Sequence, residues 1–217
     1  EFRLGARIED RRAVQRPVGA VSPAIDVSAA AQLAALYRPA APIAPCGPPA
    51  SQTLGLLLAC IDRQPQRVLA VDLGEQVLWL TYALPTAQIV ALEPAGRAEQ
   101  RRAVVARHSV AERVQVHPAP ARHPGLAHYY DEWYDPDGLT GTFDLLLLGR
   151  GTAAVFPAVP LLGPVLAPGA AVVLPDDEGS PVAAWRDAGL VDVDEVLSTP
   201  PIVALRTVPA GRSRSVG

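Results

Sequence analysis

Residues 67–94 read RVLAVDLGEQVLWLTYALPTAQIVALEP, and the fold class can be predicted from their pattern. Residues 67–74 form a continuous apolar strand, and a helix over 77–84 and a second strand over 88–93 follow it. Strands that are apolar on both faces and alternate with helices are typical of a parallel sheet covered on both sides. The stretch therefore predicts one strand–helix–strand unit of a doubly wound α/β sheet.

The same alternation continues in both directions along the chain. Upstream, Ser51 caps a helix over 52–63 that is apolar almost all round, so we expect it to be buried. Downstream, we expect a helix over 96–108, a strand over 113–117, a polar helical stretch, a strand over 143–148, a helix through 161–166 that ends at Pro168-Gly169, and a strand over 170–174.

The end of the chain departs from this alternation. A short helix over 181–190 is followed by strands over 191–197 and 202–208, with only a Pro-Pro turn between the two strands. They must pair antiparallel, because a parallel crossover needs about a dozen residues or more. The sequence thus predicts an α/β protein with a seven-stranded, mostly parallel sheet and a terminal antiparallel hairpin.

This element order resembles the class I S-adenosylmethionine-dependent methyltransferase family over residues 51–209. The resemblance is best in three places: residues 67–74, residues 89–94 (IVALEP), and residues 143–148 together with 162–174 (LGPVLAPGAAVVL). Among the subfamilies, the small-molecule O-methyltransferases are the most similar. The resemblance implies a Rossmann-like methyltransferase fold, S-adenosylmethionine as the cofactor, and a small-molecule acceptor that is methylated on a hydroxyl group.

Glu93 is the strongest candidate for a binding residue. It ends the second strand and lies 19 residues after Gly74, in the register in which a carboxylate accepts two hydrogen bonds from a ribose diol. A surface glutamate before a proline turn is the alternative reading. With the family's pattern carried over, the expected cofactor-binding residues are Asp72, Leu73, Gly74, Glu93, Pro94, Ala119 and Leu148.

The glycine-rich loop departs from the family's pattern. Members usually carry two or three glycines after the first strand, whereas this loop, Asp72-Leu73-Gly74, has one. Asp72 is either the acidic member of the motif or the cap of the following helix. The segment after the fourth strand, Gly149-Arg150, lacks the aspartate that metal-dependent members place there. We therefore expect no metal, and we interpret Asp176 and Asp177 as loop residues, since two adjacent carboxylates do not complete a Mg²⁺ site.

The segment after the third strand gathers most of the remaining chemistry. His123 and His128 are candidate general bases, with solvated surface histidines as the alternative. Aromatic and acidic side chains follow, and this stretch is either a border of the acceptor pocket or a half-buried helical turn. The candidate substrate-binding residues are Tyr129, Tyr130, Trp133 and Tyr134.

Composition narrows the class of protein further. The chain has 217 residues, 49% of them hydrophobic, and a formal net charge of −3, which argues against a basic nucleic-acid binder and against disorder throughout. Lys, Asn and Met do not occur, which indicates a high-GC bacterial genome. No apolar run is long enough to span a membrane, and Cys46 and Cys60 share no metal-binding spacing, so we expect a cytoplasmic protein with reduced thiols.

The domain organisation follows from the density of proline. Residues 1–50 form an Arg- and Pro-rich arm or cap with one short helix over 29–37, residues 51–209 form the α/β domain, and residues 210–217 form a flexible tail. The arm could mediate a homodimer. Two function classes stay open: an active, metal-independent methyltransferase, and an inactive descendant that serves as a binding or interaction subunit. A nicotinamide-dependent dehydrogenase fits poorly, because G-x-G-x-x-G does not occur.

Overall fold

The computed structural model describes residues 51–61, 63–74, 76–119, 138–149, 156–175, 180–198 and 201–208. The predictions for the arm over 1–50 and for the tail over 210–217 lie outside these residues. No helix in the described part of the chain is both long and apolar enough to cross a membrane.

Helices and strands alternate as the sequence predicts. In chain order the elements are α2 (Ser51–Ile61), β1 (Arg67–Val71), α3 (Gln76–Ala83), β2 (Gln88–Pro94), α4 (Ala95–Val105), the 3₁₀ helix η2 (Ala111–Arg113), β3 (Val114–Ala119), β4 (Phe143–Leu148), α5 (Ala158–Leu162), the 3₁₀ helix η4 (Gly163–Val165), β5 (Leu166–Pro175), α6 (Val182–Asp187), β6 (Val191–Ser198) and β7 (Pro201–Thr207).

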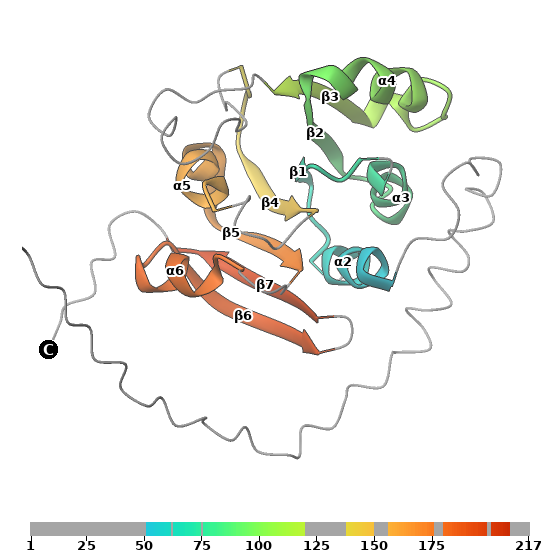
Figure 1. The fold of residues 1–217 in the computed structure, drawn as a ribbon. Helices are drawn as coiled ribbons and strands as arrows, with labels where there is room; N and C mark the ends of the chain where they lie inside the picture. Colours follow the sequence, from blue (N-terminus) through green and yellow to red (C-terminus); the bar gives the residue numbers. More distant parts are fainter. Residues whose placement is uncertain are drawn as a thin grey trace, which may run out of the picture.

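The strands form one seven-stranded sheet in the order β3-β2-β1-β4-β5-β7-β6 (Figure 1). The pairs among β1 to β5 are parallel, while β7 runs antiparallel to both β5 and β6. This arrangement confirms the predicted fold class and the terminal hairpin. It also inserts the last strand between β5 and β6, so that β6 becomes an edge of the sheet.

Helices cover both faces of the sheet, and each face has its own core. On one face, α2, α3 and α4 pack on alternate strand residues such as Val68 and Leu147. On the other face, α5 and α6 pack on the alternate set of strand residues, such as Leu69 and Leu146. Because strand side chains alternate between faces, both sets are buried, which explains the unbroken apolar runs in the sequence.

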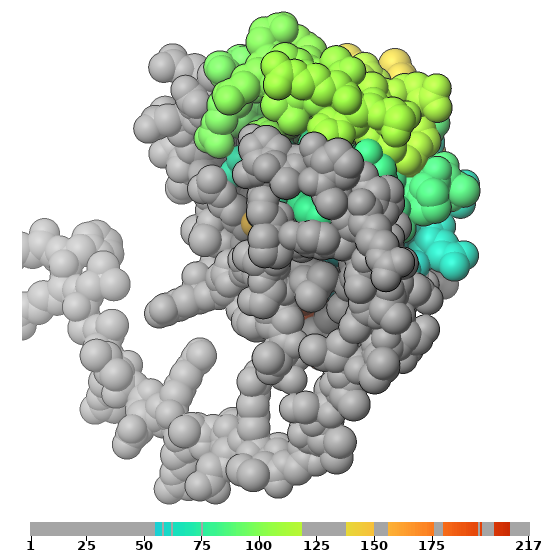
Figure 2. Space-filling view, turned by 90° about the vertical axis from the view of Figure 1, so that its right-hand side faces the viewer, coloured from blue at the N-terminus to red at the C-terminus, as the bar shows by residue number. Residues whose placement is uncertain are grey.

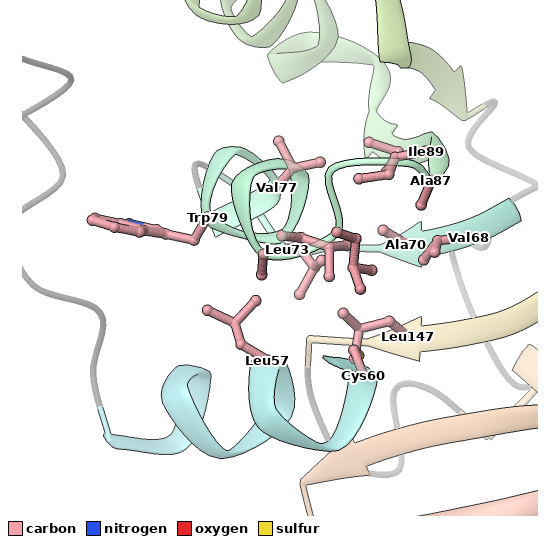
Figure 3. Close-up of a cluster of buried hydrophobic side chains, with 14 of the residues drawn as sticks. Leu57, Cys60, Val68, Ala70, Leu73, Val77, Trp79, Ala87, Ile89 and Leu147 are labelled. Carbon is pink, nitrogen blue, oxygen red and sulfur yellow. The ribbon is translucent and has the colours of Figure 1, made fainter. Parts of the chain in front are cut away.

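The first core is built around α2 and the loop after β1. Figure 3 shows Leu57 and Cys60 of α2 pointing toward Leu73 and Leu147 on the sheet side. Cys60 is a free thiol, and burial raises its pKa to about 12, so it stays protonated and acts as a small apolar side chain. Cys46 lies outside the described residues. Figure 2 shows this helical face from outside, with α4 and the segment up to β3 forming its upper part.

Two polar side chains connect elements that are distant in the sequence. The carboxylate of Asp144 on β4 accepts hydrogen bonds from the backbone N–H groups of Gln66 (2.8 Å) and Arg67 (3.0 Å), which aligns the starts of β1 and β4. The guanidinium of Arg113 donates to the backbone oxygens of Thr81 and Leu84 at the end of α3. It thereby satisfies carbonyl groups that a helix terminus leaves without an intrahelical donor.

The largest departure from the predicted boundaries is at the start of β5. The sequence predicts a helix that ends only at Pro168-Gly169, whereas α5 ends at Leu162 and β5 begins at Leu166. The strand accommodates these residues through an irregularity: Phe143 pairs with Leu166, and Leu145 then pairs with Ala171. Pro168 cannot donate to a ladder and Gly169 has a φ of +76°, so both residues fit a bulge.

Candidate functional site

The carboxyl ends of three strands meet at one edge of the sheet. Val71 of β1 pairs with Leu92 of β2 on one side and with Leu148 of β4 on the other. The residues that follow these three, Asp72, Glu93 and Gly149, therefore lie at the same edge. In open parallel sheets this edge is where ligands bind.

The loop after β1 turns sharply at two residues. Asp72 has a φ of +53° and Gly74 a φ of +60°, both in the left-handed region, which glycine adopts freely and aspartate only at a cost. The N–H of Asp72 donates to the carbonyl of Leu92, while the N–H groups of Gln76 and Val77 donate to Leu73 and Gly74 at the start of α3. A strained aspartate held at a strand end is typical of functional loops.

Gly149 makes the close approach of β4 to this loop possible. Its N–H donates to the carbonyl oxygen of Val71 over 3.0 Å. A Cβ atom at position 149 would lie only 2.5 Å from the backbone oxygen of Asp72. Only glycine fits here without moving the loop, so Gly149 is required for the shape of the site.

Glu93 is the central polar group of the site. Its side chain is completely buried, and its Oε1 accepts a hydrogen bond of 3.0 Å from the N–H of Gly74. Its Oε2 is buried and has no hydrogen-bond partner among the described residues. The alternative reading of Glu93 as a surface residue is therefore wrong: the carboxylate points into the fold and bridges β2 to the loop after β1.

Burial sets the charge state of this carboxyl group. Desolvation is the largest influence and raises the pKa of Glu93, and the nearby Asp72 carboxylate raises it further. Arg101 is the largest influence in the opposite direction, followed by the Gly74 N–H and Arg97. Because the net shift is upward, the fold holds Glu93 less readily ionised than a carboxyl group in water.

Arg101 is a site residue that the sequence analysis missed. It comes from α4, its Nε lies 3.7 Å from Oε1 of Glu93, and it is 9% exposed. The buried residues of α4 are Ala98, Arg101 and Val105, which share one helix face, but the sequence alone does not show which face of this helix turns inward.

The remaining predicted cofactor-binding residues fall into two groups. Leu73 and Leu148 are buried in the two cores, so only their backbone atoms can face a ligand. Pro94 is half-buried, precedes α4, and pairs with Ala119 at the end of β3. The carboxyl-terminal edge of the sheet, from β4 across to β3, is therefore lined by Leu148, Leu73, Pro94 and Ala119. Glu93 lies among them on β2.

Several predicted site residues lie outside the described part of the chain. These are the two histidines, the four aromatic residues and the two aspartates: His123, His128, Tyr129, Tyr130, Trp133, Tyr134, Asp176 and Asp177. The described residues on either side of the aromatic segment nevertheless come together. Its first end is Ala119, and at its second end a Cβ atom on Gly138 would lie 3.4 Å from Cε1 of His117 on β3.

Within the described residues, no group of three or more His, Cys, Asp or Glu side chains has the arrangement of a metal site.

Comparisons with known proteins address the fold. No protein-family model and no curated protein matches the chain. The methyltransferase PaMTH1 of Podospora anserina, bound to S-adenosylhomocysteine, is similar with a TM-score of 0.57 at 16% identity, covering 88% of this chain and all of the other (100%). The O-methyltransferase TomG of Streptomyces achromogenes, in complex with S-adenosylmethionine, has a TM-score of 0.50 at 21% identity, covering 82% of this chain and 90% of TomG.

A third solved structure agrees with these two. The O-methyltransferase of Bacillus cereus in complex with S-adenosylhomocysteine has a TM-score of 0.50 at 17% identity, covering 82% of this chain and 91% of the other. At such identities the likeness concerns the fold alone. The chain thus has the α/β fold of these methyltransferases, and the resemblance predicted from the sequence is confirmed at that level.

Proposed function

We propose that this chain is an S-adenosylmethionine-dependent methyltransferase that methylates a hydroxyl group of a small-molecule acceptor without a metal ion. The fold supports the proposal, since the similar structures named above are methyltransferases, one crystallised with S-adenosylmethionine and two with S-adenosylhomocysteine. Fold alone does not assign a function, so the proposal depends on the site.

The observation that carries the proposal is the Glu93 carboxylate. It lies at the carboxyl end of β2, where one oxygen is bonded to the Gly74 N–H and the other is buried without a hydrogen-bond partner among the described residues. A buried carboxylate oxygen without a donor costs about 1–3 kcal/mol or more, so the position favours a ligand that donates hydrogen bonds. The two hydroxyl groups of a ribose are such donors.

The surrounding residues fit the remainder of the cofactor. Gly74 carries no side chain, so an extended ligand can approach the backbone of the loop after β1 at this residue. Asp72 adds a second acidic group at the same edge, which suits a ligand with a net positive charge. When bound, S-adenosylmethionine supplies a methyl group on a sulfonium centre. The chain's own residues then have to bind and orient the acceptor against it, which is where most of the rate gain arises.

The acceptor side of the proposal depends on the segment between Ala119 and Gly138. Both of its described ends lie at β3, beside the edge where Glu93 stands. We propose that its aromatic residues contact the acceptor and that His123 or His128 accepts the hydroxyl proton. Gly149-Arg150, in place of a metal-binding aspartate, supports methyl transfer without a metal.

Calorimetric titration with S-adenosylmethionine and S-adenosylhomocysteine tests the proposal. We expect the wild-type chain to bind both, and Glu93→Ala to weaken binding by about 1–3 kcal/mol, because hydrogen bonds to a charged group are lost. Glu99→Ala is the matched control, since Glu99 is on α4 but its side chain is 83% exposed. The control should bind like the wild type. Absence of binding by the wild type would contradict the proposal.

A second candidate function rests on a separate observation. Arg101 already pairs with Glu93, and the Glu93 side chain is completely buried, so this carboxylate has a charged neighbour without any ligand. An inactive descendant of the fold, acting as a binding or interaction subunit, would be expected to keep this pair permanently. That candidate replaces the first if neither ligand binds and no methyl transfer is detected.

A further inference from the structure

An arginine occupies a position on α4 that belongs to the core. The buried face of this helix consists of Ala98, Arg101 and Val105. Arginine is almost never buried without a partner, and helix side chains lean toward the helix N-terminus. Glu93 lies two residues before the first residue of α4, so the geometry of the helix directs the Arg101 side chain back toward that carboxylate.

The guanidinium group of Arg101 lies close to both Glu93 and Gly74. Its Nε is 3.7 Å from Oε1 of Glu93, and a Cβ atom on Gly74 would lie 3.4 Å from its Nη2. The group therefore extends from the carboxylate to the one glycine of the loop after β1. In the function proposed above, the carboxylate binds the ribose of the cofactor, and the remainder of the cofactor approaches the glycine.

The ion pair leaves much of the carboxylate's hydrogen-bonding capacity unused. The distance from Nε to Oε1 is longer than the ~2.7–2.9 Å of a charge-assisted hydrogen bond. Oε2 of Glu93 has no hydrogen-bond partner in the described part of the chain. Arg101 thus compensates the charge of Glu93 without satisfying its lone pairs, whereas a diol with two O–H donors would satisfy them.

We propose that Arg101 is a built-in competitor for the ribose site: its guanidinium group holds Glu93 in the unliganded protein and leaves the carboxylate when a ribose diol binds. This inference rests on the proposed function and adds a regulatory residue to it. It makes cofactor affinity depend on the cost of breaking an internal ion pair. Removal of Arg101 should therefore tighten binding, although it removes a native interaction.

The test compares the wild type with Arg101→Leu and Arg101→Gln by calorimetry, with S-adenosylhomocysteine as the probe because it carries no sulfonium charge. We expect both variants to bind about tenfold more tightly, which corresponds to ~1.4 kcal/mol. Arg102→Leu is the matched control. It removes the same charge from the next position of α4, but Arg102 donates to the Val116 carbonyl and pairs with Glu99. Its affinity should equal that of the wild type.

Two further measurements show whether the gain arises at the ribose site. The gain should shrink for the 2′-deoxy analogue of the probe, and it should vanish when Arg101→Leu is combined with Glu93→Gln, as a double-mutant cycle requires for coupled residues. Affinities are compared over a pH series, because the raised pKa of Glu93 makes its charge depend on pH. The charged groups that influence Glu93 are Asp72, Arg97 and Arg101. Thermal melting establishes that each variant is folded.

The outcomes separate this inference from the proposed function. If the wild type binds and the Arg101 variants bind no better, the inference is wrong and the proposed function stands. If only the Arg101 variants bind, the inference is supported, and the wild-type chain is not an active methyltransferase. If no folded variant binds the probe, both are wrong.

Discussion

Glu93 shows at the scale of a single residue how the fold sets chemistry. Its carboxyl group is buried, and burial raises its pKa above the usual 4.5 despite the two arginines and the backbone N–H nearby. An acid whose pKa is raised by folding binds its proton more tightly in the folded state. Its contribution to stability is therefore fully present below the unfolded pKa and is lost as pH rises through the folded pKa.

This sign gives a prediction for Glu93→Gln. The unfolding free energy of the wild type minus that of the variant should decrease as pH rises above about 4.5. It should level off once Glu93 is ionised in the folded state. Chemical denaturation over a pH series measures this difference, in which the titration of all other groups largely cancels.

Glu99→Gln serves as the control for this measurement, because the Glu99 side chain is 83% exposed. Its difference from the wild type should stay nearly constant with pH. A wild-type advantage over Glu93→Gln that grows with pH would show that the charged pair with Arg101 outweighs burial, which contradicts the prediction.

The two partners of this residue pair differ in how far the sequence could predict them. The place of Glu93 follows from local order: a carboxylate at the end of the second strand, 19 residues after Gly74, is in register for a βαβ site. The role of Arg101 depends on which face of α4 turns inward. Among the charged residues of that helix, only the packing on β2 and β3 selects the one that is buried.

The junction of β1 and β4 is decided at the scale of elements. Gly149→Ala should destabilise the protein by about 1–3 kcal/mol, the usual cost of forcing an extra methyl group into a packed site. The reason is that the new Cβ atom would lie 2.5 Å from the backbone oxygen of Asp72, and backbone cannot rotate away as a side chain can. Urea unfolding measures the loss, and cofactor affinity should fall with it because the loop moves.

Gly96→Ala is the control for this substitution. Position 96 lies within α4, and a Cβ atom there meets nothing within 4 Å. Alanine should be neutral or should stabilise the helix by up to about 1 kcal/mol. Equal stability of the two alanine variants would mean that β4 can withdraw from the loop at little cost.

Most elements were predictable because their signals are local. Apolar runs on both faces identified the strands, and Pro-Pro together with short spacing identified the terminal hairpin. The start of β5 was not predictable, because Pro168 and Gly169 are signals that end a helix in the sequence alone. In the sheet they form a bulge, since pairing with β4 supplies hydrogen bonds on both sides of the irregularity.

The prediction at the scale of the whole molecule concerns metal. Once an acceptor is found, methyl transfer followed with labelled S-adenosylmethionine should proceed unchanged in the presence of a chelator. The physical reason is that β4 is followed by Gly149-Arg150 rather than by a carboxylate ligand. Activity that is lost on chelation and restored by Mg²⁺ would contradict this and would make Asp176 and Asp177 candidate ligands.

The class of fold, the number of strands, the terminal hairpin and the position of Glu93 could all be predicted from the sequence, because periodicity and spacing act over short distances along the chain. Three features required the folded chain: β7 lies between β5 and β6, Gly149 contacts the loop at Asp72, and Arg101 pairs with Glu93. These contacts join elements that are far apart in sequence or depend on which helix face is buried. Packing of the two cores selects them, and no local pattern records that choice.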